Sequence, residues 1–483
     1  MSRMLLSAFL GHAAFAALLT SASAQDVTAT PPDPAAETNA SEEVVVTAQR
    51  RKENVQKVPL AVSAIAGDKP DAQAIVGFEN LGTRVPSLRF GSGVTGGEHV
   101  ITLRGLSSQN TTSGGDSPVA YNVDGVYLAR STAVDSEFFD ISRIEVLRGP
   151  QGTLYGRNSV GGSVNVITNK PDGDLAAYAD VMLGDYGAFT GRAWANLPLT
   201  GDTSGTKVYA RLTGVYAEHD PYQSNDSALP GATRDGDAQD FYLVRGQLLF
   251  QFSGDVQLLL SASTTSNGSP VATKLAWGTA PLANQARFIG QTYNPDPRST
   301  SAGWPERFDQ KNDLYSATLD WDLGGMTLTS VTAFTTGEWF QTNDADSTSL
   351  DIAHLNYWTM DSEQFSQEVR LASDNDNALR WIVGAYYFRE KVNQGFQFVD
   401  TGLNAPFGTG FVFTNGGDIK TTSWAAFGQL DYDLSKTSMD IPLTLTVGLR
   451  YTSDTKAVDD FLNYSIPDFA FNLALAKSVE ASW

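Results

Sequence analysis

The stretch Asp313–Leu323 reads DLYSATLDWDL and alternates apolar with polar side chains. Its apolar face comprises Tyr315, Ala317, Leu319, Trp321 and Leu323. Because alternate side chains of a β-strand share a face, this stretch predicts a strand between an apolar and an aqueous medium. The pattern recurs in SWAAFGQLDYDL (residues 423–434) and in LTLTVGLRY (residues 443–451), with aromatic residues near the strand ends. Apolar faces flanked by aromatic residues are typical of strands that cross a lipid bilayer.

The connections between such stretches alternate in length from residue 171 onward. Short turns such as FSGD, DLGG and SDNDNA alternate with long polar segments at residues 265–312, 341–361 and 391–418. This rhythm is typical of outer-membrane barrels, whereas a soluble β-sandwich rarely has three loops longer than ~15 residues. We therefore predict an all-β membrane barrel over residues 171–483, built from about eleven antiparallel transmembrane strands.

The strand number predicts that only part of this barrel is present. A barrel must close to satisfy its backbone in lipid, and bacterial single-chain barrels have an even number of strands. Plugged outer-membrane transporters are built from roughly 22 strands. We therefore expect the first ~11 of these strands, a C-terminal truncation, and a chain end in an external loop that finishes LAKSVEASW.

The first part of the chain follows other patterns. Residues 1–24 combine a basic start, an apolar run and small residues, which predicts a cleaved secretory signal peptide. Residues 25–42 are rich in Pro, Ala, Thr and acidic residues, so we expect a flexible periplasmic tail. The run EVVVTA (residues 43–48) is suited to pairing with another protein's sheet edge or to beginning the next domain. Residues 49–170 contain short strands between glycine pairs, which predicts a compact α+β domain.

Composition excludes several classes of function. The chain has no Cys, which removes disulfides and thiolate chemistry, and its net charge of −21 includes no basic run for nucleic acid. A G-x-G-x-x-G at residues 91–96 precedes a strand rather than a helix, which favours a loop over a dinucleotide site. We expect no metal site, no cofactor and no enzyme, because no catalytic set can be assembled and these histidines are scattered: His12, His99, His219 and His354.

The most specific motif lies at Ile141–Pro171, ISRIEVLRGPQGTLYGRNSVGGSVNVITNKP. It predicts a strand, a Gly-Pro turn and a returning strand. Together with VITLRGLSS and VAYNVDGVYL before it, this motif resembles the plug signature of the TonB-dependent outer-membrane receptors, especially siderophore receptors. The resemblance covers the chain after the signal peptide and implies an N-terminal α+β plug domain at residues 49–170. The signature positions here are Arg104, Gly105, Asp124, Gly125, Arg143, Glu145, Arg148, Gly149, Pro150, Gly152, Tyr155, Gly156, Arg157, Gly161 and Gly162.

The same resemblance implies roles for particular residues. In such receptors, charged plug residues would face the polar interior of the barrel, here Arg104, Arg143, Glu145, Arg148 and Arg157. The family's energy-coupling segment, which binds TonB as an added strand, is similar to Glu43, Val44, Val45, Val46, Thr47 and Ala48. The implied partners are TonB with ExbB/ExbD at the inner membrane, outer-membrane lipid of a Gram-negative bacterium, and a small-molecule ligand such as an iron-siderophore.

We therefore expect active import of a scarce solute, with a ferric siderophore as the default cargo. Cobalamin, an oligosaccharide or an aromatic compound are alternative cargoes, and a passive porin or a surface binding protein is a remote alternative. The ligand contacts are unknown, and the plug apex from Gly91 to His99 is the candidate region. Aromatic residues near the external loops suit sugars as well as catecholates, namely Phe340, Tyr357, Trp358, Phe396, Phe398 and Phe411.

Overall fold

The structure is a computed structural model, in which residues Val44–Trp483 form one compact unit. It describes residues 45–51, 53–67, 78–92, 99–107, 114–130, 138–200, 205–225, 235–236, 238–252, 254–268, 298–300, 302–345, 353–374, 377–401, 410–438, 440–466 and 471–482. The predicted signal peptide, the predicted tail and the first two residues of the coupling segment, Glu43 and Val44, lie outside these residues.

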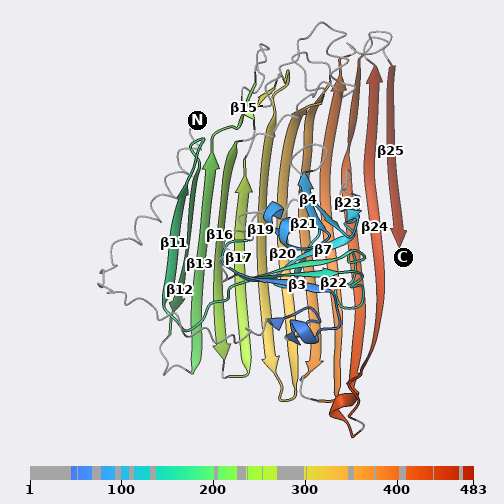
Figure 1. Cartoon of the computed structure of the whole chain (residues 1–483). Helices are drawn as coiled ribbons and strands as arrows, with labels where there is room; N and C mark the ends of the chain where they lie inside the picture. Colours follow the sequence, from blue (N-terminus) through green and yellow to red (C-terminus); the bar gives the residue numbers. More distant parts are fainter. Residues whose placement is uncertain are drawn as a thin grey trace, which may run out of the picture. The chain divides into compact units, whose positions relative to one another are not determined.

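A twelve-stranded antiparallel sheet makes up most of this unit, and each strand pairs with its neighbours in chain order (Figure 1). Its strands are β11 (Ala176–Leu183), β12 (Phe189–Pro198), β13 (Thr206–His219), β16 (Gln239–Phe252), β17 (Val256–Asn267), β19 (Arg307–Asp322), β20 (Met326–Asp344), β21 (Ala353–Ser373), β22 (Leu379–Asp400), β23 (Phe411–Asp433), β24 (Thr444–Ile466) and β25 (Phe471–Ser482). A small three-stranded sheet adds β14 (Gln223–Asn225), β15 (Asp235–Gly236) and β18 (Ser299–Thr300). The predicted partial barrel is confirmed.

The two faces of the large sheet differ as the alternation predicted. Its outer face exposes large apolar side chains, including Tyr315, Trp321, Trp424, Val447 and Leu449. The inner face contains buried polar side chains, including Arg245, Gln364, Glu368, Glu390 and Asp431. Such a distribution suits lipid on the outside and a polar interior on the inside. Among the described residues, no helix is both long and apolar enough to span a membrane.

Two details of the sequence prediction were wrong. Phe471–Ser482, interpreted as part of an external loop, is strand β25 and pairs with β24, so the sheet has twelve strands, close to the predicted number of about eleven. The long connections at residues 341–361 and 391–418 are also largely strand, since β20 reaches Asp344, β21 starts at Ala353, and β22 and β23 pair up to Asp400 and Phe411. These strand ends are rich in polar residues, so they lack the apolar alternation on which the prediction depended.

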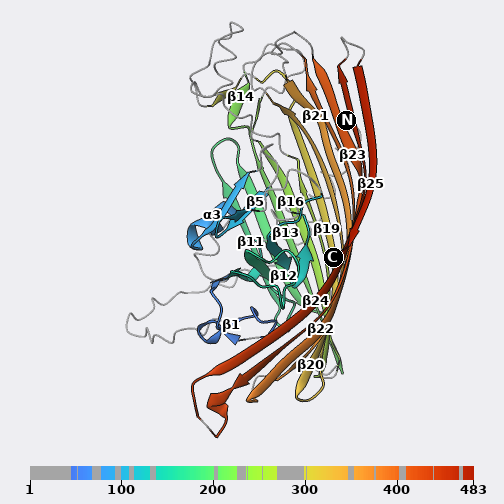
Figure 2. The ribbon, with the colours of Figure 1, turned by 90° about the vertical axis from the view of Figure 1, so that its right-hand side faces the viewer.

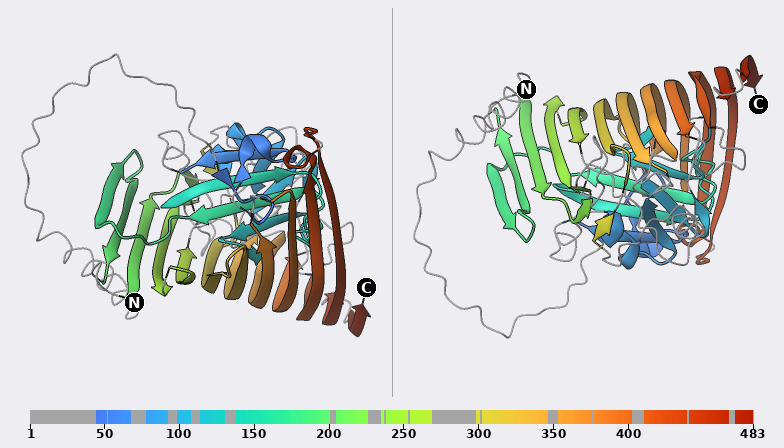
Figure 3. Two further views of the ribbon diagram at one scale, coloured as in Figure 1. Left: turned by 90° about the horizontal axis from the view of Figure 1, so that it is seen from below. Right: turned by 90° about the horizontal axis from the view of Figure 1, so that it is seen from above.

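The N-terminal domain is a plug that lies on the inner side of the curved sheet (Figures 2 and 3). Its main sheet has the order β3-β9-β10-β7-β8, formed by β3 (Val62–Ala66), β9 (Ile141–Arg148), β10 (Gly162–Thr168), β7 (Val119–Val123) and β8 (Val126–Leu128). A second sheet contains β4 (Leu88–Ser92), β5 (His99–Leu103) and β6 (Leu106–Ser107), and helix α3 spans Phe78–Arg84. The plug core also includes Val331 and Ala333 of β20, so apolar packing joins the plug to the barrel wall.

Candidate functional site

The described part of the coupling segment is docked on the plug. Val45 and Val46 form β1 (Val45–Val46), which pairs antiparallel with β2 (Glu53–Asn54). Val46 and Ala48 are almost fully buried, and they pack in one cluster with Leu147 of β9. Apolar burial and the pairing of two residues of β1 with β2 therefore hold the segment in this position.

Glu145, at the centre of the plug signature, binds the coupling segment directly. Its Oε1 accepts hydrogen bonds from the backbone N–H of Thr47 at 2.7 Å and from the Thr47 hydroxyl at 3.0 Å. Arg143 donates to the same oxygen at 2.7 Å and also to the Thr47 hydroxyl at 3.2 Å. Because the Glu145 side chain is fully buried, its charge depends on these partners. The Arg143–Glu145 pair thus contacts the coupling segment rather than the barrel.

Tyr155 also contacts the docked segment, through the backbone carbonyl of Thr47. Its hydroxyl donates weakly to the Thr47 carbonyl at 3.5 Å and accepts from Asn165 at 2.9 Å. Burial raises the pKa of this hydroxyl to about 12. Tyr155 therefore remains a neutral donor throughout the physiological pH range.

Glycines in the signature occupy positions where a side chain would not fit. Gly162 has φ +141°, and a Cβ there would lie 2.1 Å from the Leu147 carbonyl oxygen of the paired strand β9. Gly156 has φ +76°, and a Cβ there would lie 2.5 Å from a guanidinium nitrogen of Arg450 on β24. The signature is therefore conformationally restricted both inside the plug and against the barrel wall.

The end of the plug is anchored to the first barrel strands through Asp140. Arg211 donates two hydrogen bonds to the Asp140 carboxylate, and Thr213 and Asn169 donate one each. Arg245 of β16 lies 3.7 Å from the same carboxylate. Burial opposes the charge, yet the bonds from Arg211, Thr213 and Asn169 hold the pKa of Asp140 below its usual range. This cluster fixes the plug to β13 and β16.

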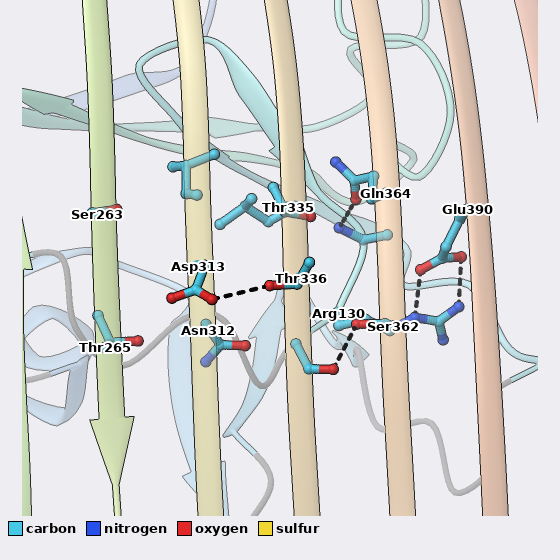
Figure 4. Close-up of a pocket in the computed structure, with 14 residues that line it drawn as sticks. Arg130, Ser263, Thr265, Asn312, Asp313, Thr335, Thr336, Ser362, Gln364 and Glu390 are labelled. Atoms are coloured by element: carbon cyan, nitrogen blue, oxygen red, sulfur yellow. Dashed lines mark hydrogen bonds and ion pairs between the residues drawn. The ribbon is translucent and has the colours of Figure 1, made fainter.

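A second ion pair joins the plug to the middle of the wall. Arg130, just after β8, donates two hydrogen bonds of 2.6 Å to the carboxylate of Glu390 on β22 (Figure 4). Gln364 of β21 accepts from the Ala129 backbone N–H and donates to the Tyr127 carbonyl. Beside these contacts lies a small hollow that is partly open to solvent. Its lining combines polar residues, such as Ser263, Thr265 and Gln364, with the apolar Leu128, Ala129 and Leu314.

Apolar contacts seal other parts of the boundary between plug and wall. Leu154 packs with Ile382 and Phe427. Tyr127 packs against Phe388, with ring centroids 6.0 Å apart. In the described residues, the plug and the wall are thus joined by apolar clusters as well as by ion pairs.

Three charged residues directly after the coupling segment also contact the wall. Arg50 lies 3.5 Å from Glu368, and Arg51 lies 3.5 Å from Asp431. Glu53 lies 3.1 Å from Arg380. The sequence analysis did not single out these residues. The sequence feature that could have pointed to them is the charged run QRRKE after EVVVTA. Nothing in that run identifies partners on β21, β22 and β23.

Aromatic side chains gather on the inner face of the outer half of the sheet. Phe308, Trp339 and Trp358 form a buried cluster with Met360 and Val392, and Phe396 packs against it. The rings of Trp339 and Trp358 meet edge to face with centroids 4.4 Å apart. Barrel interiors are usually polar, so this buried apolar cluster is an exception, and the partly buried ring of Phe396 is the member that a ligand could reach.

The predicted aromatic set is divided between the two faces of the sheet. Trp358 and Phe396 belong to the inner cluster, and Phe396 and Phe398 alternate on the same side of β22. Phe411 pairs with Asp400 at the outer ends of β22 and β23 and faces Phe398 at 6.0 Å. Phe340, which lies next to inward Trp339, points to the opposite face. Tyr357 lies next to inward Trp358 and therefore points to the opposite face, and a bulge between Leu355 and Tyr357 interrupts the pairing there.

The remaining predicted site residues lie in turns of the plug. Arg104 and Gly105 connect β5 to β6, and Asp124 and Gly125 form the tight turn between β7 and β8. Arg148 ends β9, Gly149 and Pro150 follow it, and Gly152 and Gly161 lie in the loop before β10. Arg157 donates to Asp116 and lies over the ring of Phe388 on the wall. Of the candidate apex, Gly93–Glu98 lies outside the described residues.

The histidines are separate from one another. His219 stacks on Tyr222, and His354 stacks on Trp304. Nothing is described of His12 or of the side chain of His99. Across the part of the chain that the structure describes, no group of three or more His, Cys, Asp or Glu residues could hold a metal ion.

Comparisons with known proteins match both halves of this arrangement. Residues 54–163 match the TonB-dependent receptor plug domain, and residues 261–476 match the TonB-dependent receptor-like β-barrel. The chain is 27% identical over 245 residues to the iron-regulated outer membrane virulence protein of Vibrio cholerae, covering 47% of this chain and 34% of that protein. It is 24% identical over 205 residues to the vitamin B12 transporter BtuB of Photobacterium profundum, covering 40% of this chain and 32% of that protein.

Solved structures are similar in fold. The ferric yersiniabactin uptake receptor FyuA of Yersinia pestis superposes with a TM-score of 0.68 at 16% identity, covering 88% of this chain and 61% of that receptor. The curated relatives are matched over about a third of their own length. The plug signature, the docked plug and the partial barrel agree with these matches. The chain belongs to the TonB-dependent receptors, a family of outer-membrane transport proteins rather than enzymes.

Proposed function

We propose that this protein is an outer-membrane receptor that imports a scarce solute by TonB-dependent active transport, most simply a ferric siderophore. The observation that carries this proposal is the contact between the coupling segment and the plug signature, through Thr47 and Glu145. A pull on residues 43–48 by TonB and ExbB/ExbD would act on the plug at this contact. The barrel cannot supply energy itself, so the pull must come from the inner membrane.

A ferric siderophore as cargo is supported by the functions of similar proteins. The solved structures with this fold include receptors for ferric yersiniabactin and for ferric catecholates. Curated relatives also include a vitamin B12 transporter and a hemin receptor, so cobalamin and heme are alternative cargoes. The inner aromatic cluster around Trp339 and Trp358 suits the flat rings that several of these compounds carry.

A passive porin is disfavoured by the plug itself. Apolar clusters and ion pairs fasten the plug to the wall, for example at Phe388 and Glu390. A domain that fills the lumen would block passive diffusion through an open pore. A surface binding protein, in turn, needs no coupling segment bound to the plug.

A whole-cell uptake panel tests this function. The protein is produced in cells that lack their own receptors, in one strain that has TonB and in one that lacks it. Each strain is given iron-55 siderophores, heme or labelled cobalamin. We expect one compound to accumulate only when both the receptor and TonB are present. Accumulation that is equal with and without TonB would contradict active transport. Binding without accumulation in cells with TonB would favour a surface binding protein.

A further inference from the structure

The outward face of the large sheet carries a row of aromatic side chains toward the outer strand ends. The row comprises Tyr315, Phe334, Phe365, Tyr387 and Trp424, which are between 38% and 50% exposed. They come from the neighbouring strands β19 to β23, and cross-strand pairing places Tyr387 beside Trp424. Aromatic rows of this kind lie at the boundary between the hydrocarbon of a membrane and its headgroups. Outward side chains beyond the row are therefore at the level of the lipid headgroups.

Three basic side chains follow directly beyond this row on β22 and β23. Arg389 and Lys391 are exposed and alternate with buried residues of β22, so they share the outward face with Tyr387. Lys420 of β23 is exposed and pairs directly with Lys391 across the two strands, and Arg389 is its diagonal neighbour. Opposed like charges weaken a strand pair, so this arrangement is suited to an anion that bridges them.

Carboxylates form an ion pair with only one of these three cations. Lys391 lies 3.9 Å from Asp418, and it is also opposite Glu363 of β21. Within the part of the chain that the structure describes, Arg389 and Lys420 form no ion pair. Three cations and two carboxylates therefore leave a net positive charge on this group of side chains.

The outward cations of β19 differ in this respect. Arg307 forms an ion pair with Asp309, and Lys311 lies 3.7 Å from Asp313. Lys311 is also opposite Glu338 of β20. Each of these two cations thus has a carboxylate on its own strand. This part of the outward face is already neutralised, and it provides a matched comparison for the cations on β22 and β23.

We propose that Arg389, Lys391 and Lys420 form a headgroup patch that binds the phosphate group of an anionic lipid in the outer leaflet of the outer membrane. The guanidinium can donate two hydrogen bonds to phosphate oxygens, and the two ammonium groups add point charges beside it. Long basic side chains can lie along apolar surface while their charged ends reach the headgroup level. The inference goes beyond the proposed transport, because it depends only on the position of these strands in the membrane.

A lipid suits the headgroup patch better than a soluble anion does. On the side of the aromatic row, the outward face continues as apolar surface, where Val383, Tyr387 and Trp424 are exposed. One lipid molecule can place its phosphate on the cations and its acyl chains on this surface. Basic residues beside membrane-spanning segments attract anionic headgroups in the same way.

Lipid titration of the purified receptor tests the headgroup patch. The receptor in nonionic detergent is titrated with lipid A, a phosphorylated glycolipid, and bound lipid is counted by native mass spectrometry. In the Arg389→Gln, Lys420→Gln variant we expect the dissociation constant to rise about thirtyfold, which corresponds to about 1 kcal/mol for each basic side chain beside an anionic membrane surface. The matched control is Arg307→Gln, Lys311→Gln, which removes two outward cations that have carboxylate partners. It should change the constant by less than about threefold.

Further measurements separate the headgroup patch from other causes of weak binding. The Arg389→Lys, Lys420→Arg variant keeps both charges and should bind lipid A as the unsubstituted receptor does. Lipid A without its phosphates should bind weakly, and millimolar inorganic phosphate should not displace intact lipid A. Equal binding of lipid A with and without its phosphates, or equal losses in the two glutamine variants, would overturn the headgroup patch. Displacement by inorganic phosphate would overturn it too, in favour of a site for soluble anions.

Discussion

Replacing Asp140 by alanine should loosen the plug from the first strands of the barrel. The carboxylate accepts hydrogen bonds from Arg211, Thr213 and Asn169, and its side chain is fully buried. Its loss leaves the buried Arg211 without its carboxylate partner, whereas Arg245 keeps its hydrogen bonds to the Phe139 and Asp140 carbonyls. Removing one member of a buried ion pair costs about 3–5 kcal/mol, which corresponds to an increase of roughly two to four orders of magnitude in the open population.

Hydrogen exchange of the solubilised receptor measures this effect. Amides of β9 and β10, which flank Asp140 and Asn169, should lose about 3–5 kcal/mol of protection in Asp140→Ala. The matched control is Asp180→Ala, since Asp180 also accepts two hydrogen bonds from an arginine, Arg192, but in a more exposed pair. That variant should lose at most about 1 kcal/mol. Equal losses in the two variants, or no loss in Asp140→Ala, would refute the reasoning.

Three further outcomes are expected. Acidification should weaken the same anchor, because the donors to Asp140 lower its pKa: its contribution is complete above the ordinary aspartate pKa and is lost as pH falls through the lowered value, seen as faster exchange in β9 only below the ordinary aspartate pKa. Gly162→Ala should prevent correct pairing of β9 with β10, seen as a protease-sensitive plug, whereas Gly91→Ala, which has open space, should not. Trp358→Ala should weaken binding of the transported compound by about tenfold or more, whereas outward Trp424→Ala should leave the dissociation constant unchanged.

The sequence predicted the faces of the barrel strands well. Period-two alternation is a local property, so Tyr315, Trp321 and Leu449 could be assigned to the outer face from neighbouring residues alone. The same criterion failed for the outer ends of β20 to β23. Those ends carry the aromatic residues of the inner cluster among many polar residues and lack a continuous apolar outer face, so the outward alternation is lost although their backbone pairing continues.

The ion pairs of Arg50, Arg51 and Glu53 with the barrel wall could not be predicted from the sequence. Arg50, Arg51 and Glu53 are separated from their partners by 318, 380 and 327 residues along the chain. A charged run in a polar stretch usually indicates a solvated surface. Only the folded barrel brings Glu368, Asp431 and Arg380 next to it. The role of Glu145 was hidden for the same reason, since Thr47 is 98 residues away.

The proposed function requires that transport is driven through residues 43–48, and a proline in that segment is a direct test of this requirement. Val45→Pro removes a backbone N–H that an added strand needs, while Val45→Ala keeps it. The compound is the one that accumulates in the uptake panel. Its surface binding and its initial uptake rate are both measured. We predict that cells with the Val45→Pro variant bind the compound normally but take up no more of it than cells that lack TonB. Cells with the Val45→Ala variant should transport it normally. Uptake by Val45→Pro at the rate of the unsubstituted receptor would contradict the account.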